Sequence, residues 1–118
     1  MSSSSERLYD LSLIEEMAGG DEDFMKELAE TFVASVPPVV DSMVQACKAA
    51  DWQKVGKEAH NLKSNIETLQ IKSISTDIRT IEANGKHGLD IDITADLVYK
   101  VERVMLQAIE QIKEQYHL

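Results

Sequence analysis

The chain has 118 residues, of which 43% are hydrophobic, 28% are charged and only 5% are aromatic. This length is that of one domain, and so few aromatic residues predict an aliphatic core, which suits packed helices better than a β-sandwich or barrel. A formal charge of −9 argues against a nucleic-acid partner, because phosphate backbones are bound by clustered Lys and Arg.

The single cysteine and the lack of long apolar runs indicate where in the cell the protein is expected. Cys47 is the only cysteine, which excludes an internal disulfide and a multi-Cys metal site and fits a reducing cytoplasm. No apolar run approaches the ~20 residues of a membrane span, and the N-terminus lacks the order of a signal peptide. We therefore expect a cytoplasmic protein without membrane contact, with a disordered tail over residues 1–7 and one domain over residues 8–118.

Helical periodicity begins directly after the tail. A short helix is expected after Asp10, with Leu11, Ile14 and Met17 facing inward, and Gly19-Gly20 should end it.

A long second helix follows, with Asp21 as its N-cap. Pro37-Pro38 should bend it near Ser35, because each proline removes a backbone donor. The apolar pattern keeps its phase beyond the prolines, which favours one bent helix over two. The predicted inward residues are Phe24, Leu28, Phe32, Val36, Val39, Met43 and Ala46 or Cys47.

The second half of the chain predicts three more helices. Asp51 should cap a third helix that runs to about Leu69, and a tight connection over residues 70–73 leads to a fourth helix. Asn84-Gly85 should end that helix, and residues 86–93 should form the longest loop. Thr94 is the expected cap of the last helix. The inward residues are Ile74, Ile78 and Ile81 in the fourth helix, and Leu97, Val101, Val104, Ala108, Ile112 and Tyr116 in the last.

Together these elements predict an all-α fold. Four helices of about three or more turns, joined by short loops, should pack as an antiparallel up-down four-helix bundle. The short first helix would cap one end.

The third helix displays a histidine to solvent. Its apolar residues recur at spacings of 4, 3, 4 and 3, at positions Val55, Ala59, Leu62, Ile66 and Leu69. With about 100° per residue, His60 lies roughly 140° from the centre of this stripe, Lys63 at about 80° and Lys57 at about 200°. A histidine that packs in the core would point the other way.

The chemistry available to the chain is narrow. It has no Gly-rich phosphate loop, no nucleophile elbow and no paired Glu-x-x-His motifs, so we expect no ATP site, no metal site and no enzyme of its own. An exposed imidazole, largely neutral at pH 7, can attack a phosphoryl group, and Lys63 can screen the added charge. Lys57, nearly one turn earlier, is a second candidate for this role. Gly56 and Ser64 are small and would let a partner come close. By pattern alone, a surface His between two Lys is also common on amphipathic helices.

Three motifs resemble those of histidine-containing phosphotransfer (HPt) domains. The first is the run Ala59-His60-x-Leu62-Lys63 in the middle of a helix. The second is Gly19-Gly20-Asp21-x-x-Phe24, which resembles the "GGD" turn that opens the family, and the third is Ala50-Asp51-Trp52, which resembles the usual "GDW". The similarity spans about Leu8 to Ile112.

The chain also departs from the family pattern. Ser64 stands where the family usually has the glycine that makes room for the partner, and Gln70 stands at another frequent glycine. Asn61 replaces the glutamine that plant-type members carry directly after the histidine, so a bacterial-type domain is the better match.

The resemblance implies a phosphocarrier in a multistep His–Asp phosphorelay. His60 would accept a phosphoryl group on Nε2 from the phospho-aspartate of one receiver domain and pass it to another, and Lys63 would steady the phosphorylated ring. The bundle would need no cofactor, since Mg²⁺ would be held by the receiver. The implied partners are response-regulator receiver domains, with a hybrid histidine kinase as a further candidate, and the bundle itself would be a monomer. The residues that would form or border the docking surface are Gly56, Lys57, Asn61, Ser64 and Glu67, together with exposed apolar side chains of the first two helices.

Two alternatives stay open at this point. A degenerate bundle of this kind could dock receivers without carrying phosphate, and Ser64 and Gln70 are the residues that favour it. The chain could also be the phosphoacceptor domain excised from a larger histidine kinase.

Overall fold

The protein is described by a computed structural model over residues 6–118, so the serine run of the expected tail lies outside the described residues. Within this range the chain forms helices and no strands, which confirms the predicted all-α fold. The helices are α1 (Ser12–Ala18), α2 (Glu22–Lys48), α3 (Trp52–Thr68), α4 (Ser75–His87) and α5 (Ile91–Tyr116), with a 3₁₀ turn, η1 (Lys72–Ile74), before α4.

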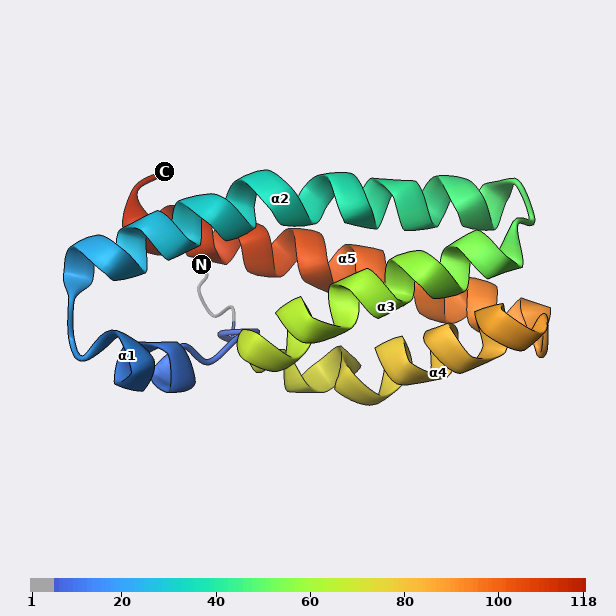
Figure 1. Ribbon diagram of the computed structural model, residues 1–118. Coiled ribbons are helices and arrows are strands. Elements are labelled where there is room, and N and C mark those ends of the chain that lie inside the picture. The colour runs from blue at the N-terminus through green and yellow to red at the C-terminus, as the bar shows by residue number, and fades with distance from the viewer. Residues whose placement is uncertain (1–5) are drawn as a thin grey trace.

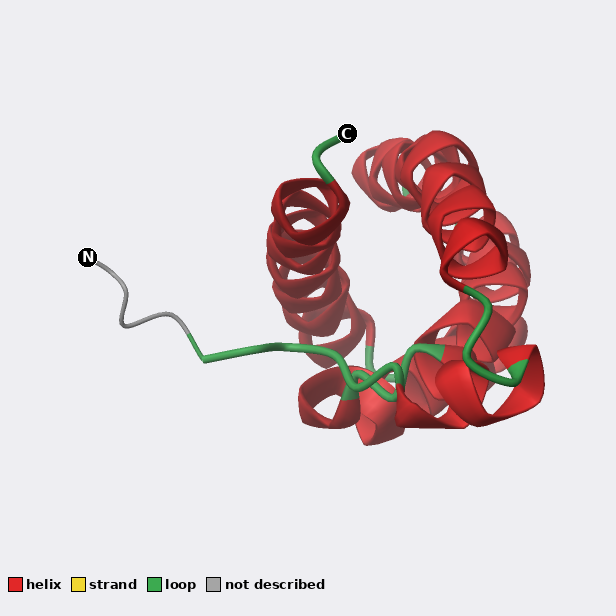
Figure 2. Ribbon diagram, turned by 90° about the vertical axis from the view of Figure 1, so that its left-hand side faces the viewer, coloured by secondary structure: helices red, strands yellow, loops and turns green. Residues whose placement is uncertain are grey.

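Helices α2 to α5 form the bundle. Helix α2 packs on α3 and α5, and α4 packs on the same two helices, so that the four surround one interior (Figures 1 and 2). Successive helices run in opposite directions, as short loops require. The predicted up-down bundle is confirmed.

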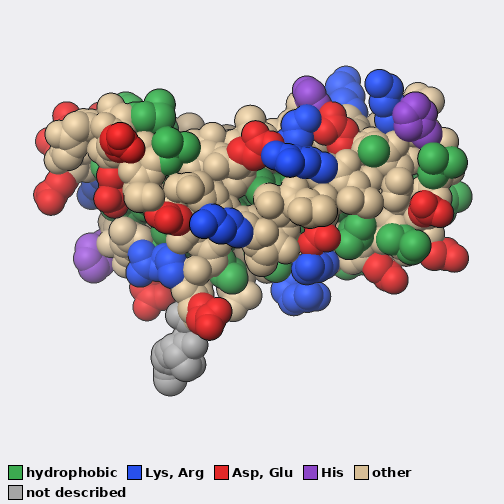
Figure 3. Space-filling view, turned by 90° about the horizontal axis from the view of Figure 1, so that it is seen from below, with side chains coloured by type: hydrophobic (Ala, Val, Ile, Leu, Met, Phe, Trp, Pro, Cys, Tyr) green, Lys and Arg blue, Asp and Glu red, His purple; other side chains and the backbone are tan. Residues whose placement is uncertain are grey.

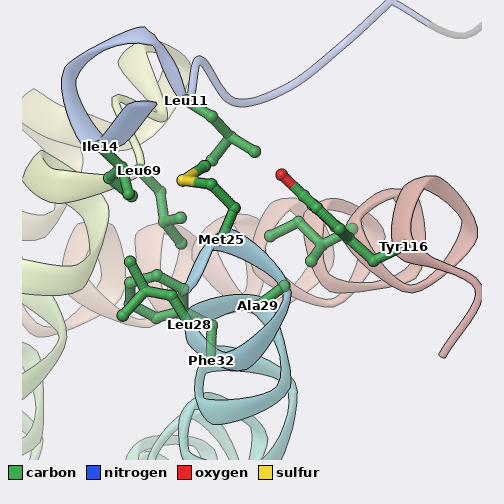
Figure 4. Close-up of a pocket in the computed structure, with 9 residues that line it drawn as sticks. Leu11, Ile14, Met25, Leu28, Ala29, Phe32, Leu69 and Tyr116 are labelled. Carbon is green, nitrogen blue, oxygen red and sulfur yellow. The ribbon is translucent and has the colours of Figure 1, made fainter. Parts of the chain in front are cut away.

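The helices differ in length, and this explains the place of α1. Helices α2 and α5 have 27 and 26 residues, whereas α3 and α4 have 17 and 13. The shorter pair leaves one end of the longer pair uncovered, and α1 lies against that end (Figure 1). Leu11 and Ile14 of this segment meet side chains of α2, α5 and the end of α3 there, with a gap of only ≈ 10 Å³ between them (Figure 4).

The core is aliphatic, as the composition predicts. The fully buried side chains come from all four bundle helices and include Val36, Met43, Leu62, Ile66, Ile78, Ile81, Val101 and Met105.

The last two residues of the expected tail contact α5. The backbone carbonyl of Glu6 accepts a hydrogen bond from Gln111 Nε2 at 2.9 Å. Arg7 Nη1 donates to Gln115 Oε1 at 2.7 Å. Both partners lie on α5.

Two predicted inward residues near the N-terminus face solvent. Met17 is 77% exposed, because the two-turn helix α1 rests on the bundle through the face that carries Ile14, with Leu11 just before it. Phe24 is 43% exposed, and its neighbour Met25 is buried in its place. Adjacent residues of a helix point about 100° apart, so Phe24 and Met25 cannot both face the core. Met25 is the one that faces Leu11 and Ile14 and, on α5, Tyr116.

Most helix ends agree with the sequence. The carboxylate oxygen Oδ1 of Asp21 accepts from Phe24 N, and that of Asp51 from Lys54 N, so both predicted N-caps are confirmed. Gly19 ends α1 in the left-handed conformation. Helix α2 continues through Pro37-Pro38, so the prediction of one helix is confirmed.

The predicted end of α4 and the loop after it are wrong. Helix α4 passes through Gly85 to His87, and Gly88, at φ 64°, is its C-cap. Helix α5 starts at Ile91, so the connection is much shorter than residues 86–93. Thr94 is therefore no cap: it is buried within the first turn, where its hydroxyl donates to the carbonyl of Asp90 at 2.9 Å.

Ala50, which stands at the first position of the motif that resembles "GDW", and Gln70 both have left-handed backbone. Ala50 has φ 56° and Gln70 has φ 50°. Glycine adopts this region without the steric cost that a Cβ brings, which explains why a glycine suits both places. Gln70 has a compensating contact, since its Nε2 donates to the carbonyl of Asp10 at 3.2 Å.

We expect Ala50→Gly to stabilise the protein by about 0.5–1 kcal/mol, because it removes the left-handed strain of an L side chain. The free energy of unfolding in urea measures this. The matched control is Ala49→Gly, at φ −85°, which should not stabilise. Equal effects of the two substitutions would contradict the assignment of strain to Ala50.

Candidate functional site

His60 stands on the outer face of α3. Its side chain is 64% exposed, whereas Ala59 and Leu62 beside it in the sequence are fully buried. The predicted exposed placement of this ring on a regular helix is confirmed.

A carboxylate from α4 holds one side of the ring. Glu82 Oε2 lies 2.6 Å from His60 Nδ1, and Glu82 Oε1 lies 2.9 Å from Lys63 Nζ. One carboxylate thus joins the histidine and the lysine that follows it by nearly one turn. We call His60, Lys63 and Glu82 the His60 cluster.

This contact selects the tautomer of the neutral ring. An ionised carboxylate only accepts hydrogen bonds, so Nδ1 must carry the proton when His60 is neutral. Nε2 then keeps a free lone pair and points away from Glu82. The ring is therefore oriented and its nucleophilic nitrogen is the outer one.

Lys63 and His60 stabilise the negatively charged form of Glu82. The hydrogen bond from Lys63, and after it the one from His60, lowers the pKa of Glu82 below its ordinary value, against a smaller opposing effect of burial. The side chain is only 25% exposed. Both hydrogen bonds therefore favour the ionised form of Glu82.

The position of α4 relative to α3 depends on two glycines. A Cβ on Gly85 would lie 2.7 Å from both Gly56 N and Trp52 O, and a Cβ on Gly56 would lie 2.9 Å from Lys86 N. The backbones of the two helices are in direct contact at this point. Because Glu82 is one turn from Gly85 and His60 is one turn from Gly56, this contact brings Glu82 to His60.

The expectation that Gly56 makes room for a partner is therefore wrong. Gly56 is buried, and the space that its missing side chain leaves is filled by the backbone of α4.

The other predicted residues share the outer face of α3 with His60. Lys57, Asn61, Ser64 and Glu67 are all exposed. Asn61 Nδ2 donates to Glu58 Oε1 at 3.0 Å, and Glu67 pairs with Arg79 of α4 at 2.9 Å. Of these four residues, Lys57 lines the same hollow as His60 and Glu82.

An open hollow of ≈ 460 Å³ adjoins the ring on the N-terminal side of α3. It is lined by Gln53, Gly56, Lys57, His60, Glu82 and Lys86. Figure 3 shows Lys or Arg side chains close to histidines at the upper right of the molecule, with acidic side chains nearby.

Glu82 and Lys86 are the site residues that the sequence reasoning missed. The sequence pattern places Lys86 in a loop, and nothing in the α4 pattern marks Glu82 as the residue opposite His60. The pair Gly56 and Gly85, one on each helix, is the sequence signal that could have indicated the register of α3 against α4.

We expect Gly85→Ala to destabilise the fold by about 1–3 kcal/mol, because its methyl group would overlap the backbone of α3. Helix propensity alone predicts the opposite sign, a gain of about 1 kcal/mol. The control is Ala83→Gly, at an exposed position of α4, which should cost about 1 kcal/mol. Urea unfolding of both variants measures this, and a stabilised Gly85→Ala would contradict the contact.

We expect the ¹⁵N NMR shifts of the neutral His60 ring to show a protonated Nδ1 and an unprotonated Nε2. Glu82→Ala should give a mixture of tautomers, because Nδ1 loses its acceptor. Glu67→Ala, which removes an exposed carboxylate paired with Arg79, is the control and should leave the ring unchanged. An Nε2-protonated ring in the unaltered protein would contradict the orientation by Glu82.

Within residues 6–118, no group of three or more His, Cys, Asp or Glu side chains has a metal-binding arrangement. Over the same residues, the helices are all too short or too polar to cross a membrane.

Comparison with known proteins identifies the family. The family described as "Hpt domain" has a model that matches residues 27–115, a span that contains α3, α4 and the whole His60 cluster. Comparison with curated proteins found no match, and comparison with solved structures found none either. Because the family match covers well over half of the chain, this protein belongs to the Hpt domain family, whose members are phosphocarrier modules of histidine phosphotransfer in phosphorelays.

Proposed function

We propose that this protein is a histidine phosphocarrier in a multistep His–Asp phosphorelay and that His60 is its phosphoacceptor. The observation that carries the proposal is the exposed ring of His60 with Nδ1 fixed on Glu82 at 2.6 Å, which leaves Nε2 as the outward nucleophile.

In the proposed transfer, the bond that forms, the bond that breaks and the charge on the ring can each be assigned to named atoms. The Nε2 lone pair attacks the phosphorus of a receiver's aspartyl phosphate, the P–O bond to the aspartate breaks, and the carboxylate leaves with its electron pair. The ring keeps its Nδ1 proton and becomes cationic, and Glu82 neutralises that charge at 2.6 Å. In the next transfer, the aspartate of a second receiver attacks the phosphorus and the electrons of the P–N bond return to Nε2.

Lys63 contributes to the charge balance from the other side of Glu82. Its ammonium lies 2.9 Å from Glu82 Oε1 and supplies positive charge near the phosphorylated ring. In this proposal Lys63 holds the carboxylate that orients the ring and also adds to the stabilisation of the phosphoryl charge.

The proposed partners are response-regulator receiver domains, with a hybrid histidine kinase as a further candidate. The proposed docking surface surrounds His60 and is bordered by Lys57, Asn61, Ser64 and Glu67. Exposed apolar side chains of α1 and α2, namely Leu13, Met17 and Phe24, are proposed to contact the partner as well. The Mg²⁺ that assists transfer belongs to the receiver in this proposal, and the bundle supplies position and nucleophile.

The test is incubation of the full chain with a ³²P-phosphorylated receiver domain. We expect an acid-labile, alkali-stable label on the bundle, as a phosphoramidate requires. His60→Gln should abolish the label and keep the helical content, because the ring is exposed, while His87→Gln, at an exposed position of α4, should keep both.

A bundle that binds the receiver and takes no label would support the docking-only alternative instead. A label that survives in His60→Gln would exclude His60 as the acceptor. Circular dichroism of the same samples separates loss of the acceptor from loss of the fold.

A further inference from the structure

The His60 cluster carries no net positive charge before transfer. With a neutral ring, the charges of Glu82 and Lys63 cancel, and the Lys63 ammonium is already engaged by Glu82 at 2.9 Å. The whole chain has a formal charge of −9. After transfer the ring is cationic, but the phosphoryl group on Nε2 carries up to about two negative charges, so an excess of negative charge remains that further cations would stabilise.

Two lysines outside the cluster are placed to supply them. Lys57 of α3 and Lys86 of α4 line the same hollow as His60. Among residues 6–118, neither ammonium takes part in an ion pair. Both side chains are exposed, so their charges are available to a group bound in the hollow.

The contact between the two helices fixes this arrangement. Lys86 N lies 2.9 Å from the point where a Cβ of Gly56 would stand, so Lys86 is level with the turn of α3 that precedes His60. Lys57 lies three residues before His60 and thus nearly one turn away on the same face. The two lysines approach the hollow from different helices.

We propose that Lys57 and Lys86 bind the phosphoryl group on His60, and that Lys63 acts mainly as a positioning residue that holds Glu82 against the ring. This inference rests on the proposed function, because it needs phosphate on His60. It assigns a binding role to Lys86 and moves the main phosphate contact from the C-terminal to the N-terminal side of the histidine.

The test is a ³¹P NMR pH titration of the full chain phosphorylated with phosphoramidate. A nearby cation lowers the pKa of a phosphoryl oxygen, so Lys57→Gln and Lys86→Gln should each raise the phosphoryl pKa by about 0.5, the size of one ion interaction at ~5 Å near a solvated surface. Lys57→Arg and Lys86→Arg keep the charge and should restore most of the effect. The control is Lys54→Gln, an exposed lysine of α3 that does not line the hollow, and it should leave the pKa unchanged.

The outcomes separate the inference from the proposed function. A phosphohistidine signal whose pKa responds to Lys57→Gln and Lys86→Gln no more than to Lys54→Gln overturns the inference and leaves His60 as the phosphoacceptor. A larger response to Lys63→Gln than to either lysine of the hollow also overturns it. Absence of any phosphohistidine signal, both with phosphoramidate and with the phosphorylated receiver, removes the proposed function and the inference together.

Discussion

The close contact between α3 and α4 is the constraint on which the site depends. Gly56 and Gly85 meet so tightly that a Cβ on Gly85 would come within 2.7 Å of backbone atoms of α3. At this helix separation the short carboxylate side chain of Glu82 reaches both His60 and Lys63. Larger residues at the two glycines would separate the helices, and the ring would lose the acceptor that orients it.

Glu82 has two effects on His60: it orients the ring, and its negative charge can offset a positive charge on the ring. As the acceptor for Nδ1 it leaves Nε2 free, and as an anion it can neutralise the ring after the ring gains a phosphoryl group. The same carboxylate engages Lys63, so the cluster is balanced before transfer. In our proposal this balance leaves the recognition of phosphate to the lysines of the adjacent hollow, on the other side of the histidine along α3.

Much of the fold and part of the site could be predicted from the sequence, because these features are local. The apolar spacing of α3 predicted which face is buried, and the exposed position of His60 follows from that spacing and the helical turn. The caps at Asp21 and Asp51 are visible as side chains that can accept backbone hydrogen bonds. The prediction that Gly85 ends α4 is wrong for a physical reason. Glycine is common at helix ends and also where two helices touch, and the sequence does not distinguish the two uses.

The sequence by itself therefore determined the helices, the bundle class and the histidine that faces solvent. The tertiary structure alone decided which residues of α4 stand opposite that histidine, and so revealed Glu82 and Lys86. The reason is that periodicity specifies the rotation of each helix about its own axis, whereas the register of one helix along another depends on contacts between residues distant in the sequence. Here that register is set by the meeting of Gly56 with Gly85.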